Sequence, residues 1–149
     1  MNHFEDINRH PYLLLRSIAE PEENVLHLEV AEAMASGPAE DITISGVVLT
    51  GTQPLETIAG CYLYTIMFET YIAYAITNES YAQDAAEDRY EGKRARIYTE
   101  SAFLAFLRSS TCASSEYPGP FKHYALCCLN HIIDVASCEP PKIVCEIAS

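Results

Sequence analysis

The chain has 149 residues, 49% of them apolar, and its 9 Lys+Arg against 21 Asp+Glu give a formal net charge of −12. This length fits a single domain over residues 1–149, and the apolar content suffices for a full core, which excludes a disordered chain, a collagen and a small disulfide knot. The negative charge also argues against a nucleic-acid partner, because the phosphate backbone repels it.

The first half of the chain has the patterns of β-strands. Residues 12–19 form a compact apolar run, and residues 25–32 alternate apolar and polar side chains with the period of a half-buried strand. Residues 20–24 between them are typical of a turn, so the two strands are predicted to form a hairpin. A further strand is predicted over residues 42–49, which are rich in β-branched side chains.

Residues 61–77 are apolar on both faces, so their period alone does not separate a buried strand from a buried helix. Their aromatic and β-branched content favours a strand. A single strand of this length is unusual, so a bend or a break is predicted near Glu69 and Thr70. Residues 79–92 are polar and acidic and predict a surface loop, which a short strand over residues 95–98 follows.

The one clear helix is predicted over residues 99–109. Thr99 is its expected N-cap, and Glu100 suits the first turn, where the helix dipole favours negative charge. Phe103, Phe106 and Leu107 follow at helical spacing. We therefore expect these three side chains to pack on the sheet.

Residues 121–136 predict a long strand, although the spacing of their apolar side chains also fits a helix. Residues 142–147 predict a last short strand. Because runs of strands precede one late helix, the predicted fold class is α+β. In this fold a mainly antiparallel β-sheet carries the helix over residues 99–109 on one face.

Six cysteines stand at irregular spacings, at positions 61, 112, 127, 128, 138 and 145. A signal peptide needs an apolar run after a basic start, and acidic Glu5 and Asp6 occupy the place where that run would begin. No apolar stretch reaches the roughly 20 residues that span a bilayer. We therefore expect a soluble cytoplasmic protein that does not bind membranes and whose thiols are reduced.

The densest polar cluster holds Cys127, Cys128, His131 and Asp134. It offers zinc ligands, but neighbouring positions point to opposite faces of a strand and no C-x2-C pair exists. A Cys/His nucleophile pair stays open, because such partners meet in space rather than in sequence. His123 and His131 would lie about 26 Å apart on one strand unless it folds back. No catalytic, metal or cofactor residue is therefore assigned.

Acidic residues are concentrated in residues 1–60, which hold ten acids and two bases. The predicted hairpin that turns at residues 20–24 brings several of these acids close together, and three tyrosines share one strand parity. Tyrosine anchors protein interfaces, although core packing explains the same pattern. The predicted partner-binding residues are Glu20, Glu22, Glu23, Glu29, Glu32, Tyr62, Tyr64 and Tyr74.

Three classes of function fit these observations. The first is a non-enzymatic acidic protein that inhibits a basic protein partner such as a toxin, since opposite charge steers association. Bacterial immunity proteins share this size and charge. The second is a small intracellular enzyme or ligand-binding protein with a pocket between sheet and helix. The third is a homo-oligomeric structural subunit, such as a homodimer joined by strand edges. Convergent polar groups in a pocket would favour the second class, and a flat acidic face rimmed by aromatics the first.

Overall fold

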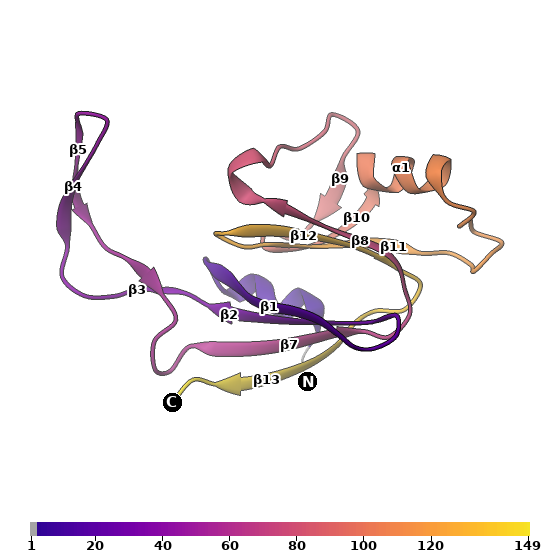
Figure 1. Cartoon of the computed structure of the whole chain (residues 1–149), viewed down its shortest axis with the longest axis horizontal. Helices are drawn as coiled ribbons and strands as arrows, with labels where there is room; N and C mark the ends of the chain where they lie inside the picture. Colours follow the sequence, from indigo (N-terminus) through magenta and orange to yellow (C-terminus); the bar gives the residue numbers. More distant parts are fainter. Residues whose placement is uncertain (1–2) are drawn as a thin grey trace.

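The structure is a computed structural model that describes residues 3–149. It is mostly antiparallel β-sheet with few helices, which confirms the predicted predominance of antiparallel strands. Two sheets face each other as two layers (Figure 1). The first sheet has the order β1-β2-β7-β13, and these strands span Leu13–Glu22, Val25–Glu32, Tyr62–Phe68 and Lys142–Ile147.

The second sheet has the order β8-β12-β11-β10-β9, and these strands span Tyr71–Asn78, His131–Ser137, Lys122–Cys127, Ala95–Glu100 and Arg89–Glu91. Two short antiparallel pairs join β3 to β6 and β4 to β5. Their bounds are Met34–Ala35, Leu55–Glu56, Glu40–Ile44 and Val47–Thr52. The helical elements are η1, η2 and α1, over Phe4–Arg9, Glu79–Tyr81 and Ala102–Ser110.

The main core lies between the two sheets and is built from the inward positions of alternating strands. Leu26, Leu28 and Val30 of β2 are buried there, as the alternation of residues 25–32 predicts. The other sheet contributes buried positions of β11 and β12, and η1 contributes Phe4 and Ile7. The side chains at the intervening positions of β11 and β12 therefore point away from this core.

The predicted break near Glu69 and Thr70 is confirmed. β7 ends at Phe68 and β8 begins at Tyr71, and the two strands belong to different sheets. The chain therefore crosses from one layer to the other at this turn (Figure 1). A break was needed because one strand of this length cannot serve both layers.

Two predicted single strands are hairpins instead. Residues 121–136 fold back between β11 and β12, where Asn130 bonds both the backbone N–H and the carbonyl of Leu15, each at 3.1 Å. Residues 42–49 turn at Ser45 and Gly46, whose φ angles are 51° and 79°. Positive φ at both central residues is the geometry of a two-residue hairpin turn, and glycine adopts it without steric cost.

The helix begins three residues later than predicted, at Ala102, and ends one residue later, at Ser110. Thr99 stays in β10, and Ser101 is the N-cap, its side chain accepting a 3.0 Å hydrogen bond from the Leu104 N–H. Leu104 and Leu107 are buried, whereas Phe106 is 61% exposed. The prediction that Phe106 packs on the sheet is therefore wrong. The Ser101 cap sets the helix rotation, which turns Leu104 and Leu107 inward and leaves Phe106 on the solvent side.

Strands β4 and β5, residues 40–52, form a hairpin that stands away from both layers (Figure 1). We call these residues the arm. The pairing places Ile42 opposite Leu49 and Ile44 opposite Val47, so these four side chains share one face of the arm. Thr43 and Val48 form a pair on the other face.

Candidate functional site

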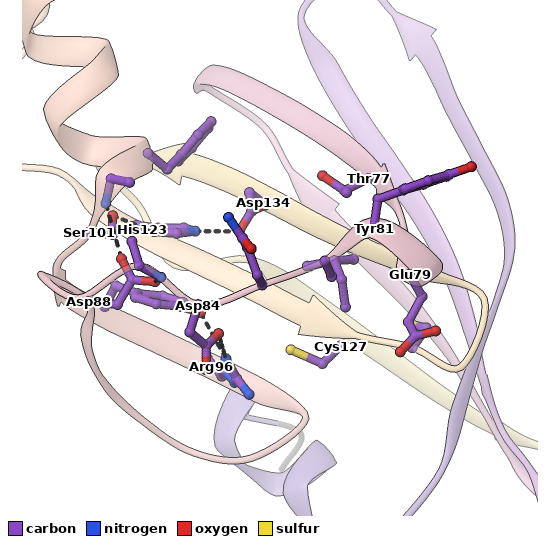
Figure 2. Close-up of a pocket in the computed structure, with 18 of the residues that line it drawn as sticks. Thr77, Glu79, Tyr81, Asp84, Asp88, Arg96, Ser101, His123, Cys127 and Asp134 are labelled. Atoms are coloured by element: carbon purple, nitrogen blue, oxygen red, sulfur yellow. Dashed lines mark hydrogen bonds and ion pairs between the residues drawn. The ribbon is translucent and has the colours of Figure 1, made fainter.

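A pocket of about 480 Å³ opens on the face of the five-stranded sheet that points away from the core. Its floor comes from β10, β11 and β12, and its walls come from residues 79–88 and from the first residues of α1 (Figure 2). The pocket therefore lies between sheet and helix, where the second class of function requires it.

Three polar side chains of this pocket form a continuous chain of hydrogen bonds (Figure 2). Ser101 Oγ lies 2.8 Å from His123 Nδ1, and His123 Nε2 lies 2.6 Å from Asp134 Oδ1. A carboxylate only accepts, so Nε2 carries the proton that it donates to Asp134. Since Ser101 Oγ already accepts from the Leu104 N–H, its hydroxyl proton is free to be donated to Nδ1 of a neutral imidazole.

The sheet register and the helix cap bring these three residues together. β11 pairs with β12 so that His123 lies opposite Ala136 and Asp134 opposite Ala125, which makes His123 and Asp134 diagonal neighbours on one face. The His123 ring stacks on Tyr98 of β10, with centroids 4.0 Å apart and an interplanar angle of 10°. This packing holds the buried imidazole in one orientation.

Charged residues surround this hydrogen-bonded chain, and acids outnumber bases. Arg96 Nη1 lies 3.1 Å from both Asp84 Oδ1 and the Tyr98 hydroxyl. Burial opposes the positive charge of Arg96, but its hydrogen bonds outweigh burial and raise its pKa, so it stays a cation. Asp88 accepts hydrogen bonds from the Ala102 and Ala85 N–H groups at 3.1 and 2.9 Å. The acids of the lining are Glu79, Asp84, Asp88 and Asp134, against Arg94 and Arg96.

The cysteines of the predicted polar cluster are poor nucleophiles in this setting. Burial raises the pKa of the Cys127 thiol, and it raises the pKa of Cys128 to about 12. Both thiols therefore stay protonated near neutral pH. His131 has a buried Nδ1 without a hydrogen-bond partner and lies outside the pocket lining. Within residues 3–149 no group of three or more His, Cys, Asp and Glu side chains is arranged to hold a metal ion, and all six cysteines are free.

Buried tyrosines, Tyr98 and Tyr64 among them, lead us to expect a loss of stability in alkali. Burial raises the pKa of Tyr98 and of Tyr64 to about 12 each, while Arg96 and Arg9 respectively oppose part of this rise. A tyrosine in the unfolded chain has a pKa of about 10. Between about pH 10 and about pH 12 the unfolded chain therefore binds fewer protons than the folded chain, and stability falls as the pH rises.

This loss is measurable by urea unfolding at about pH 9 and about pH 11. Tyr64→Phe removes one of the tyrosines with a raised pKa and should make the decline shallower, with the exposed Tyr117→Phe as the matched control. Equal stability at the two pH values would contradict the expectation. The contribution of these tyrosines is fully present below about pH 10.

Two of the five predicted partner-binding acids are engaged within the protein. Glu20 accepts hydrogen bonds from the hydroxyls of Tyr71 and Tyr74, at 2.8 and 3.0 Å. Glu32 accepts from the Tyr62 N–H at 3.0 Å and pairs with His10 at 3.1 Å. The remaining three, Glu22, Glu23 and Glu29, are exposed.

The three predicted partner-binding tyrosines do not form one contact face. Tyr64 is buried with its hydroxyl 2.5 Å from His10 Nε2, so it offers no surface to a partner. Tyr62 is half-buried on the same strand, and Tyr74 is half-buried on β8 of the other sheet. Tyr64 therefore serves internal packing, and Tyr62 and Tyr74 lie on different sheets although the three residues share one parity in the sequence.

The largest set of exposed aliphatic side chains lies on the arm. Its four-residue face of Ile42, Ile44, Val47 and Leu49 is between 41% and 59% exposed. The dipeptide Ser45-Gly46 is a turn signal for this feature, although the β-branched side chains of residues 42–49 predict one strand. Within residues 3–149 no helix is long and apolar enough to cross a membrane.

Comparisons with protein-family models, with curated proteins and with solved structures find no match to this chain. Its function is therefore inferred from its own residues.

Proposed function

We propose that the protein is an acidic binding protein, of the inhibitor or immunity type, whose arm docks into an apolar groove with a basic rim on a partner protein. The observation that carries this proposal is the four-residue apolar face of a hairpin that stands away from the protein body. Soluble proteins seldom leave such a contiguous face open unless another surface covers it.

The energetics of the arm favour a covered state. A two-stranded hairpin is at best marginally stable by itself in water. Full burial of an aliphatic side chain contributes about 1.5–3 kcal/mol, and these four are each about half exposed. Covering the face would therefore contribute about 4 kcal/mol, and it would also order the hairpin that makes the contact.

The charge of the chain supports a basic partner. The only charged residues of the arm are Glu40 and Asp41, and the whole chain carries −12. Lys and Arg around the apolar groove would pair with these carboxylates and would steer the encounter. A second copy of this chain is disfavoured because its charge has the same sign. The exposed Glu22, Glu23 and Glu29 add to the long-range attraction without touching the groove.

The test combines Ile44→Ser with Val47→Ser. The wild-type protein is used to capture a partner from the native host, the partner is identified by mass spectrometry, and its affinity is then measured with each variant. We expect a partner with basic pI, an affinity about 10²-fold weaker for the double variant, and an association rate that falls as salt rises.

Val48→Ser is the matched control, because Val48 is as exposed as Ile44 but lies on the opposite face of the arm. We expect this variant to bind like the wild type. The proposal would be contradicted by an acidic partner, or by a partner whose affinity is the same for the wild type and the double variant. Light scattering provides a further test. A stable homodimer that the double substitution dissociates would also contradict the proposal, because the arm would then serve self-association.

A further inference from the structure

The geometry points to a second activity that does not rest on the arm: the pocket on the outer face of the five-stranded sheet is an acyl-transfer centre. In it, Ser101 is the nucleophile, His123 is the general base, and Asp134 is the residue that positions the base. The substrate class is a small uncharged or cationic ester or thioester.

The first observation is the order of donors and acceptors in the hydrogen bonds that join Ser101, His123 and Asp134. Asp134 holds Nε2 of His123 at 2.6 Å, so Nδ1 faces Ser101 Oγ at 2.8 Å as an acceptor. This is the order of roles that activates a serine hydroxyl, with a carboxylate that orients the imidazole and an imidazole that takes the proton. The two ring nitrogens are exchanged relative to the chymotrypsin arrangement, which leaves the chemistry of the relay unchanged.

The second observation is that all three residues line one pocket of a size suited to a small molecule. Ser101 itself is mostly buried, with 4% of its surface exposed, so a substrate has to enter the pocket to reach it. Capping α1 and attacking a substrate are compatible, because the cap uses one lone pair of Oγ and attack uses the other.

The reaction balances with water as the only co-reactant. Ser101 Oγ forms a bond to the acyl carbon while its proton passes to His123 Nδ1. The bond from carbon to the leaving oxygen or sulfur then breaks, and the leaving group takes that proton from His123. Water, deprotonated by the same nitrogen, attacks the acyl-serine, which releases the acid and restores the hydroxyl.

The start of α1 provides a donor for the negative charge that develops on the carbonyl oxygen. Of its first N–H groups, that of Ala102 is bonded to Asp88 and that of Leu104 to Ser101 Oγ. The Phe103 N–H lies between them in the first turn, where intrahelical acceptors are lacking, and Phe103 lines the pocket.

The charges of the lining select the substrate. Asp84 forms an ion pair with Arg96, and Asp134 hydrogen-bonds the His123 imidazole, whereas the Asp88 carboxylate bonds only backbone N–H groups. Anionic esters are repelled by this carboxylate, so the site takes neutral or cationic ones.

A fluorophosphonate reagent and p-nitrophenyl butyrate test this inference on the full chain. The reagent reacts with an activated serine by forming a P–O bond and expelling fluoride. We expect mass spectrometry to find the adduct on Ser101 and the ester to be hydrolysed above the rate without protein. Ser101→Gly should abolish both signals, because glycine keeps most of the N-cap stability and lacks the nucleophile.

Ser109→Ala is the matched control on the same helix, at an exposed position outside the pocket, and should keep both signals. Asp134→Asn should lower kcat by about 10²–10⁴-fold and leave KM within about twofold, since Asp134 acts through His123. A thermal unfolding curve establishes that each variant is folded. The inference is overturned if folded wild type gives no adduct and no hydrolysis, or if both signals persist in Ser101→Gly. Neither outcome bears on the arm.

Discussion

Phe68→Ala should lower the free energy of unfolding by about 3–5 kcal/mol. Phe68 is 1% exposed, lies on β7 at the inner face of the first sheet, and meets Tyr124 of the opposite sheet with ring centroids 5.5 Å apart. Truncation removes apolar burial and leaves a cavity between two sheets that cannot collapse onto it without losing their register. The midpoint of thermal unfolding should fall by about 10 °C.

Phe106→Ala is the matched control, because it makes the same chemical change at a side chain that is 61% exposed. Its expected cost is below about 0.5 kcal/mol, the usual range for a surface position. Urea unfolding of the two variants and the wild type measures both values. A cost above about 2 kcal/mol for Phe106→Ala would show that Phe106 packs on the sheet as the sequence predicted.

His10→Ala should cost about 3–5 kcal/mol, although it removes a polar side chain. His10 is 4% exposed, and its ring nitrogens contact the Tyr64 hydroxyl at 2.5 Å and the Glu32 carboxylate at 3.1 Å. Without the imidazole, the Tyr64 hydroxyl loses its partner and the Glu32 carboxylate keeps only the Tyr62 N–H, both in a largely buried place. The cost is the desolvation of these groups, which exceeds the net contribution of the hydrogen bonds themselves.

A double-mutant cycle separates this network from simple loss of packing. Tyr64→Phe leaves the ring in place and removes only the hydroxyl, so its cost should be about 1–2 kcal/mol. Combined with His10→Ala, the two costs should fall short of additivity by about 1 kcal/mol or more. Additive costs would mean that the two side chains are not coupled. The exposed His3→Ala controls for histidine removal and should change stability by less than about 0.5 kcal/mol.

The sequence pattern does not predict the candidate site because it does not predict the turn between β11 and β12. His123 and Asp134 are eleven residues apart in a segment whose pattern predicts a single strand, which would place them far apart. The fold-back between β11 and β12 makes them diagonal neighbours. The sequence pattern misses Ser101 because it favours Thr99 as the helix cap. Asn130 favours a turn, but no neighbouring residue in the sequence indicates that its side chain would hydrogen-bond the Leu15 backbone of the other sheet.

The amino-acid sequence alone determined the β-rich class, the inward face of β2, the break at Glu69 and Thr70, and the acidic character of the surface. These follow from periods of two, turn residues and charges, which are properties of near neighbours along the chain. Only the tertiary structure decided which side chains meet: the rotation of α1, the engagement of Glu20 and Glu32 by tyrosines and His10, and the contact of Ser101, His123 and Asp134. Those contacts join residues far apart in the chain, and they depend on strand order and register, which the packing of two whole sheets settles together.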